Sequence, residues 1–163
     1  MRSLFFERPG KLRWRDVPPP HLVEPTDALV RPLAVARCDL DAAIVAGAAP
    51  FRGRLLHWLR DGLPRSIGRD GIFPRAPFAG PFPFGHECVA EVIEVGASVT
   101  TVAPGARVVV PFQIACGTCE RCRRGVTASC SAVSPGASYG FGRGDWGGVM
   151  ADVVRVPFAD HML

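Results

Sequence analysis

The sequence predicts a mainly β protein, a small and partly open antiparallel barrel with short helices and a cysteine-rich lobe. Its 163 residues suit one compact core. Glycine and proline together supply 18 + 16 = 34 of these residues, and this content favours short strands and turns over long helices. Four of the six cysteines lie within the single segment 116–130.

Strand signals come first along the chain. Residues 1–37 read as strands, because 12–15 alternates in polarity and 28–36 is a longer β-like run. A short helix is expected over 39–45. Three later strands are predicted from renewed apolar patterning, at 84–96, 107–112 and 149–156.

Residues 47–83 are interpreted as an insertion rich in Pro, Gly and Arg. Within it, 51–80 contains six Arg and two Asp, and this excess of 6 − 2 = +4 equals the net charge of the chain, 19 − 15 = +4. Because the positive charge is confined to one segment, nucleic-acid binding is not expected. One hypothesis is a helix over 51–63 that narrows a cleft mouth. A solvated surface helix and an Arg cluster that receives an anionic substrate or cofactor phosphate are the alternatives.

The N-terminus carries an apolar run of three residues, 4–6, shorter than the roughly 7–15 residues of a signal-peptide core. No run approaches the about 18 apolar residues that span a bilayer. We therefore expect a cytoplasmic protein with no membrane partner. In a reducing compartment, the cysteines are expected to be metal ligands or buried thiols rather than disulfides.

The cysteine-rich lobe, 114–132, has the spacing C-x2-C-x2-C-x7-C. Four thiolates can close a tetrahedral shell around zinc and leave no open position for a substrate, so the predicted zinc is structural. An iron–sulfur cluster is an alternative, although the fourth cysteine comes late for a ferredoxin run. Free or disulfide-paired cysteines are the other alternative. The predicted ligands are Cys116, Cys119, Cys122 and Cys130.

A second group of metal-binding residue types consists of Cys38, His86 and Glu87. Cys38 follows one predicted strand, and His86 opens another after Gly85, so both side chains could project from strand ends into one cleft. A lone Cys or His is more often a packed core residue, and this alternative stays open on the residues alone.

The lobe spacing, the run Gly85-His86-Glu87, the isolated Cys38 and the segment 147–157 together resemble the zinc-containing alcohol dehydrogenases of the medium-chain dehydrogenase/reductase family. The resemblance is to their N-terminal GroES-like catalytic domain and covers nearly all of 1–163 apart from the insertion. It implies a GroES-like, partly open β-barrel with a zinc-binding lobe.

The resemblance also implies roles for residues. Cys38 and His86 correspond to ligands of the catalytic zinc, and Glu87 to a residue that approaches or ligates the metal during water exchange. Asp41 matches the family carboxylate that orients the His ligand; a simple first-turn helix Asp is the alternative. The implied reaction is hydride transfer between a small alcohol or aldehyde and NAD(P), with a homo-oligomer for the complete enzyme.

The sequence departs from the family pattern at three places. Leu40 and Ala43 replace the hydroxyl and imidazole of the usual proton relay, so either proton release needs water or Glu87, or the substrate is unusual. Ala90 replaces a Gly, which we interpret as a packing variation. The Gly-rich run 140–147 opens no predicted helix and is rejected as a dinucleotide fingerprint.

Because no other such fingerprint is present, we expect the Rossmann domain and the third ligand of the catalytic zinc to be absent from this chain, which would then be inactive alone. The alternative is a stand-alone, zinc-stabilised GroES-like binding module without redox activity.

Overall fold

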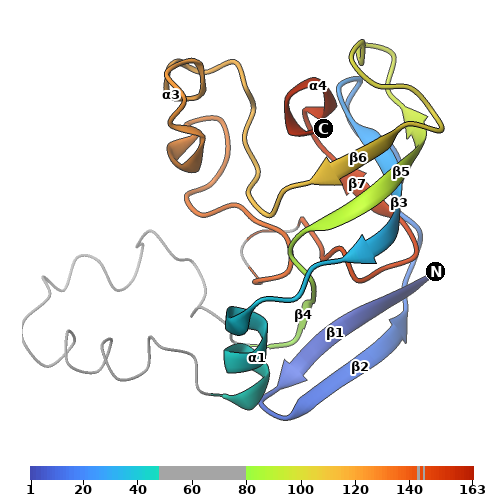
Figure 1. Cartoon of the computed structure of the whole chain (residues 1–163), viewed down its shortest axis with the longest axis vertical. Helices are drawn as coiled ribbons and strands as arrows, with labels where there is room; N and C mark the ends of the chain where they lie inside the picture. Colours follow the sequence, from blue (N-terminus) through green and yellow to red (C-terminus); the bar gives the residue numbers. More distant parts are fainter. Residues whose placement is uncertain (48–79, 143, 145) are drawn as a thin grey trace, which may run out of the picture.

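The computed structural model describes residues 1–47, 80–142, 144 and 146–163. Its strands form two antiparallel sheets that do not close into a complete barrel (Figure 1). Most of the predicted insertion at 47–83, including the helix hypothesised over 51–63, lies outside the described residues. Among the described residues, no helix has the length and apolar character needed to cross a membrane.

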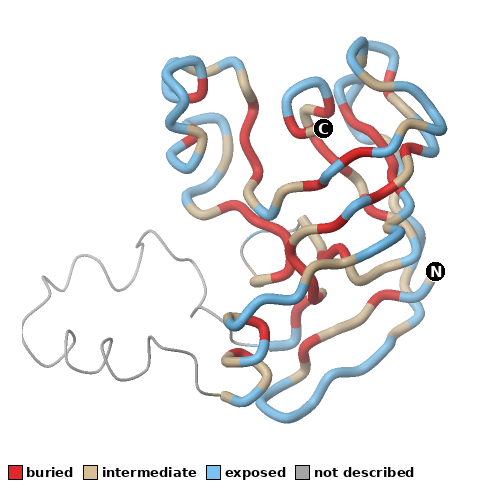
Figure 2. The backbone as a smooth tube through the Cα atoms, viewed as in Figure 1, coloured by how far each residue is buried: buried red, intermediate tan, exposed pale blue. Residues whose placement is uncertain are grey.

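The first sheet contains three strands in the order β2-β1-β4. β1 (Arg2–Arg8) and β2 (Lys11–Asp16) form a hairpin, and β4 (Phe82–Pro83) pairs with the other side of β1. The hairpin turn contains Gly10, whose φ of 74° is a left-handed conformation that glycine adopts readily. β2 is an edge strand, exposed along nearly all of its length (Figure 2).

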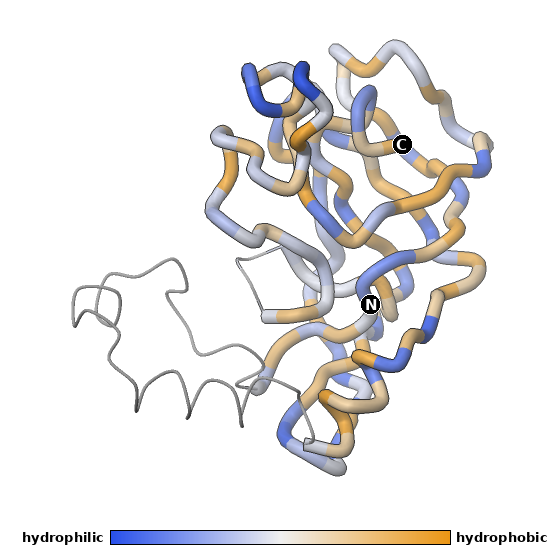
Figure 3. The backbone as a smooth tube through the Cα atoms, turned by 60° about the vertical axis from the view of Figure 1, so that its left-hand side comes forward, coloured by the Kyte–Doolittle hydropathy of each residue, from blue (hydrophilic) through white to orange (hydrophobic). Residues whose placement is uncertain are grey.

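The second sheet holds the main core and has the order β6-β5-β3-β7. Its strands are β3 (Ala28–Val35), β5 (Cys88–Val95), β6 (Arg107–Val110) and β7 (Val154–Val156). Along the described backbone, hydrophobic and hydrophilic stretches alternate (Figure 3). Side chains on the inner face are almost completely buried, among them Val30, Ala90, Val92, Val110 and Val156.

Two predicted strands are shorter than expected. The strand expected over 84–96 begins only at Cys88, since Gly85 has a φ of 91° and interrupts the extended backbone. The strand expected over 107–112 ends at Val110, because Pro111 has no N–H to donate.

The strand expected over 149–156 is divided between the two sheets. Ala151 forms a bridge with Ser3 of the first sheet. The Met150 N–H donates to the Phe84 carbonyl at 3.1 Å, and only the last three residues, β7, join the second sheet. This segment therefore links the two sheets.

The helices are short. α1 (Asp39–Ala46) confirms the helix predicted over 39–45 and ends at Gly47, whose φ is 71°. α3 (Glu120–Arg123) and the 3₁₀ turn η2 (Thr127–Ser129) shape the cysteine-rich lobe. α4 (Ala159–Met162) closes the described chain.

Candidate functional site

Cys38, Asp41 and His86 are brought together where the start of α1 meets the loop before β5. Cys38 is the N-cap of α1, and Asp41 is the third residue of that helix. His86 lies two residues before β5. Asp41 and His86 are 2% and 6% exposed, whereas Cys38 is exposed. A metal bound by Cys38 and His86 would therefore lie at the edge of the protein interior.

The Asp41 carboxylate has two separate contacts. Its Oδ2 accepts a hydrogen bond from the Cys38 N–H at 2.9 Å, which satisfies a free donor at the start of α1. Its Oδ1 lies 3.3 Å from Nδ1 of His86. Asp41 is therefore a first-turn helix residue and also the carboxylate that faces the imidazole, so the two interpretations of this residue are compatible.

One ligand atom from each of these three residues lies within 4.8 Å of the other two. Asp41 Oδ1 and His86 Nδ1 are buried without a hydrogen-bond partner in the structure. Thiol sulfur and imidazole nitrogen are donors that zinc favours. The thiol and imidazole donors fit a zinc ion held by Cys38 and His86. The two buried atoms without a hydrogen-bond partner fit a site in which Asp41 orients the imidazole for a metal.

Glu87 is not part of this cluster. It is half-buried, and its carbonyl accepts a hydrogen bond from the Ala36 N–H at 3.0 Å just beyond the end of β3. The structure thus places the Glu87 backbone beside the strand end that leads to Cys38, while its role at the metal stays a prediction.

Two aromatic side chains contact the His86 ring, and the sequence patterns did not identify them. The Phe141 ring stacks on the imidazole with centroids 5.3 Å apart and planes at 22°, and Phe112 meets it edge-on at 6.5 Å. Leu40 packs against the cluster of Phe6 and its neighbours. The position of the expected relay hydroxyl is therefore part of an apolar contact.

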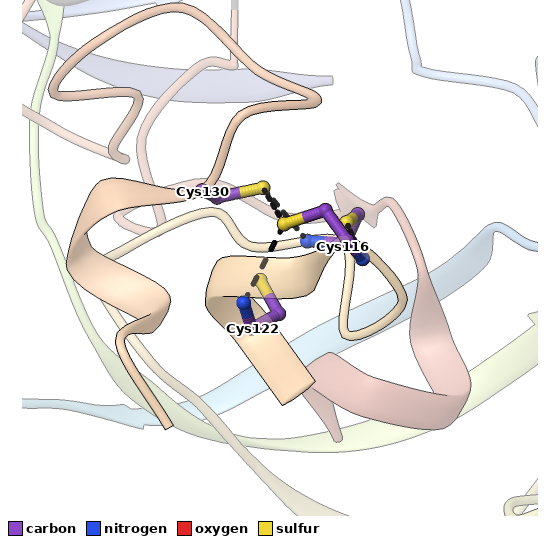
Figure 4. A group of neighbouring side chains, drawn as sticks. Cys116, Cys122 and Cys130 are labelled. Atoms are coloured by element: carbon purple, nitrogen blue, oxygen red, sulfur yellow. Dashed lines mark hydrogen bonds between the residues drawn. The ribbon is translucent and has the colours of Figure 1, made fainter. Parts of the chain in front are cut away.

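The four cysteines of the lobe form the second cluster, with all four sulfur atoms within 4.8 Å of one another. The Sγ atoms of Cys119 and Cys130 are 4.0 Å apart. Four sulfurs at about 2.3 Å from one zinc would be separated by about 3.8 Å, so this spacing fits a tetrahedral zinc site. Figure 4 shows the side chains of Cys116, Cys122 and Cys130 gathered in this cluster.

Backbone N–H groups point at the sulfur atoms of the lobe. The Cys119 N–H lies 3.3 Å from Cys116 Sγ, the Cys122 N–H 3.5 Å from Cys119 Sγ, and the Cys116 N–H 3.4 Å from Cys130 Sγ. Such donors favour thiolates over thiols, because hydrogen bonds to the charged form stabilise it.

The thiols of the lobe differ in acidity. Hydrogen bonds from the side chain and backbone of Ser131 and from the Cys122 N–H lower the pKa of Cys119 to about 5. Burial and the neighbouring cysteine sulfurs raise the pKa of Cys122 to about 12. A divalent metal bound by the four sulfur atoms would supply positive charge that stabilises all of them as thiolates.

All six cysteines lie in the part of the chain that the structure describes, and none is in a disulfide. Cys88 belongs to neither cluster and is buried in the main core. Its burial raises the pKa of the thiol to about 11, so it is a packed core residue rather than a metal ligand.

The family model described as the alcohol dehydrogenase GroES-like domain matches residues 24–163. The chain belongs to this family. The predicted resemblance is therefore confirmed, and with it the expectation of a GroES-like, mostly β fold.

Several known proteins are similar to this family member over most of its length. The glutathione-independent formaldehyde dehydrogenase of Pseudomonas aeruginosa is 29% identical over 172 residues, which cover 99% of this chain and 36% of that protein. The medium chain reductase/dehydrogenase ucsI of Acremonium sp is 35% identical over 133 residues, covering 82% and 40%. The GroES-like domain described here thus spans little more than a third of these relatives.

Solved structures of alcohol dehydrogenases are also similar to this chain. The alcohol dehydrogenase TADH from Thermus sp. ATN1 is 32% identical with a TM-score of 0.72, and the match covers 98% of this chain and 38% of that one. Zinc dependent alcohol dehydrogenase 2 from Streptococcus pneumonia is 26% identical with a TM-score of 0.67, covering 99% and 37%.

Proposed function

We propose that the chain is the catalytic-domain portion of a zinc-dependent alcohol or polyol dehydrogenase, an oxidoreductase that transfers a hydride between an alcohol and NAD(P). The observation that carries this proposal is the cluster of Cys38, Asp41 and His86 within 4.8 Å, in a chain of the alcohol dehydrogenase GroES-like family.

In this proposal, Cys38 and His86 supply two protein ligands of the catalytic zinc. Asp41 Oδ1 faces Nδ1 of His86 at 3.3 Å, which leaves the other ring nitrogen for the metal. When bound, the zinc would polarise the alcohol oxygen and lower its pKa. Glu87 is proposed to take part in ligand exchange and proton transfer, since Leu40 and Ala43 offer no hydroxyl or imidazole.

The lobe is proposed to hold the structural zinc through Cys116, Cys119, Cys122 and Cys130. A shell of four thiolates has no open position, so this metal would stabilise the loop and take no part in the reaction. The proposed count is one catalytic and one structural zinc per chain.

The nicotinamide cofactor and the substrate belong to the proposal for the complete enzyme. A putative zinc-binding dehydrogenase from Sinorhizobium meliloti, 27% identical with a TM-score of 0.60 over 96% of this chain and 36% of that one, has a solved structure bound to NADP. By this similarity we propose NAD(P) and a small alcohol or aldehyde here. A homo-oligomer and a cytoplasmic location are proposed as well, the latter supported by six cysteines without a disulfide.

Counting metal tests the proposal directly. We expect two zinc ions per wild-type chain by inductively coupled plasma mass spectrometry, with one lost in Cys38→Ala and the other lost in Cys116→Ala. Cys88→Ala is the matched control, because this cysteine lies in neither cluster, and should keep both ions.

A single zinc that survives Cys38→Ala and disappears in Cys116→Ala would contradict the catalytic site. It would instead favour a zinc-stabilised binding module without redox activity.

A further inference from the structure

The segment 139–142 approaches His86 from a distant part of the sequence, at the start of the Gly-rich run that no part of the proposed function explains. Tyr139 fixes its beginning. This residue is completely buried, its N–H donates to the Phe112 carbonyl at 2.9 Å, and its hydroxyl donates to the Arg155 carbonyl at 2.8 Å. The segment therefore starts from a rigid anchor in the main core.

Two glycines let the segment pass close to the His86 loop. Gly140 and Gly142 have φ values of 72° and 69°, a left-handed backbone that other residues rarely adopt. A Cβ on Gly140 would overlap the carbonyl group of Gly85, the residue before His86. A Cβ on Gly142 would lie 3.0 Å from the Phe82 ring. Side chains at these positions would push the segment away from the site.

Phe141 stands between these glycines and lies on the imidazole of His86. The two rings are 5.3 Å apart at 22°, and Phe112 meets both the Phe141 ring, at 6.4 Å, and the imidazole edge-on. Asp41 faces Nδ1 of the same imidazole at 3.3 Å. One face and one edge of the His86 ring are thus in contact with protein.

We propose that Phe141, held by the segment 139–142, is a positioning residue for His86. Its ring fixes the imidazole plane in the orientation in which Nδ1 faces Asp41 and the other ring nitrogen is directed to the metal. The inference rests on the proposed zinc site at Cys38 and His86.

The physical reason is that the imidazole of a histidine can rotate about its Cβ–Cγ bond. Rotation about this bond is broad, so a carboxylate alone leaves the ring plane weakly defined. A stacked aromatic ring excludes the rotated positions by steric contact and adds favourable ring–ring interaction. A ligand that is already oriented binds metal more tightly, because less ordering remains for the binding step.

Cobalt titration of the full 163-residue chain tests this role. The visible absorption that disappears in Cys38→Ala defines the second metal site and separates it from the lobe. Phe141→Leu should weaken cobalt binding at this site about tenfold, the scale typical of residues that orient metal ligands, and leave the lobe absorption unchanged. Phe141→Tyr keeps a stacked ring and should stay within about twofold of wild type.

Phe6→Leu is the matched control. Phe6 belongs to the apolar cluster against which Phe141 packs, but among the described residues its ring contacts Phe82 and Phe84 and not the imidazole. It should lower stability and leave the cobalt affinity of the second site unchanged. Equal weakening by Phe6→Leu and Phe141→Leu, or no weakening by Phe141→Leu, would overturn the proposal.

Two further measurements keep the result interpretable. If His86→Ala leaves the cobalt absorption of the second site intact, the proposed zinc site itself is refuted. If His86→Ala removes this absorption but Phe141→Leu leaves cobalt binding unchanged, only the positioning role is refuted. In the metal-free wild type, the His86 ring protons, assigned by comparison with His86→Gln, should resonate upfield in NMR spectra, because the Phe141 ring stacks on the imidazole. Resonances at ordinary imidazole positions would refute the stacking.

Discussion

Gly117 and Gly125 of the lobe have nearly the same backbone conformation but different surroundings. Their φ values are 74° and 77°. A Cβ on Gly117 would lie 2.5 Å from the His161 ring, whereas a Cβ on Gly125 would have no atom within 4 Å. The pair therefore separates the cost of a left-handed backbone from the cost of a steric clash.

We expect Gly125→Ala to lower the free energy of unfolding of the zinc-loaded chain by about 1–2 kcal/mol, the cost of placing a Cβ in this conformation. Gly117→Ala should cost more, because it also displaces His161. Guanidinium denaturation measures both values. In the double variant Gly117→Ala/His161→Ala, the loss of unfolding free energy should fall close to that of Gly125→Ala. A double variant no more stable than Gly117→Ala would contradict the clash.

The residues of the candidate site differ in how far the sequence indicated them. Cys38 and His86 are indicated by their residue types and positions, and Asp41 by the family resemblance; the structure brings these three together. Phe141 was missed, because an aromatic side chain on an imidazole is a tertiary contact without a local sequence pattern. The glycines around it were noted, but only as a candidate nucleotide motif.

The helix α4 is short, yet three consecutive side chains connect it to two distant segments. The Asp160 carboxylate accepts hydrogen bonds from the backbone and hydroxyl groups of Thr100 and Thr101. His161 lies against Gly117, and Met162 Sδ accepts from the Ala115 N–H at 3.4 Å. The helix therefore connects the lobe to the turn after β5.

The Asp160 contacts predict a pH dependence of stability. Hydrogen bonds from the Thr101 backbone and then from Thr100 hold the pKa of this carboxyl well below its usual range. Because the folded-state pKa is lower than the unfolded value of about 3.9, the carboxylate stabilises the fold at neutral pH, and this contribution is lost as the pH falls below about 4.

Asp160→Asn should therefore reduce stability at pH 7 and flatten the acid limb of the stability profile, measured by urea denaturation between pH 7 and pH 3. Asp16→Asn, at the exposed end of β2, serves as the control and should leave the profile close to wild type. An unchanged acid limb in Asp160→Asn would contradict the assignment.

Individual elements were predictable where the local pattern decides the structure. The strand at 28–36 and the helix at 39–45 appear close to their predicted bounds. The sequence predicts one continuous strand over 149–156. An extended apolar run does not specify which strands it pairs with, so the change of partner could not be predicted. In the fold, backbone pairing with Ser3 and then with β3 divides it between two sheets.

At the scale of the whole molecule, apolar burial is uneven. The main core packs valines of the second sheet around the fully buried Tyr139. The lobe cluster consists of Ala115 and three buried cysteines, with few partly buried hydrophobic neighbours. Most of the stability of the lobe is therefore expected to come from metal binding rather than from apolar contacts.

Chelation of zinc should consequently unfold 114–132 before the sheets. Hydrogen-exchange mass spectrometry is expected to show loss of protection in the lobe while β3 and β5 stay protected. Cys116→Ala should reproduce this pattern without a chelator. Lobe protection that survives metal removal would contradict the expectation.

The overall architecture was predictable because its main determinants are local, namely short strands, frequent turns and a length that suits one core. The division into two open sheets was not, since sheet closure depends on pairing between strands that are far apart in the sequence.

The number of residues between the two sheets within 149–156 determines which side chains of β7 face the core. Met150 is fixed to the first sheet, and Val154 and Val156 face the core on either side of the outward Arg155. One residue inserted between Met150 and Val154 would exchange the two faces of β7 and direct a guanidinium into the valine core. Two inserted residues would leave the same side chains of β7 facing the core and would only lengthen the connection. Insertions of an even number of residues in this stretch should therefore be tolerated better than insertions of an odd number.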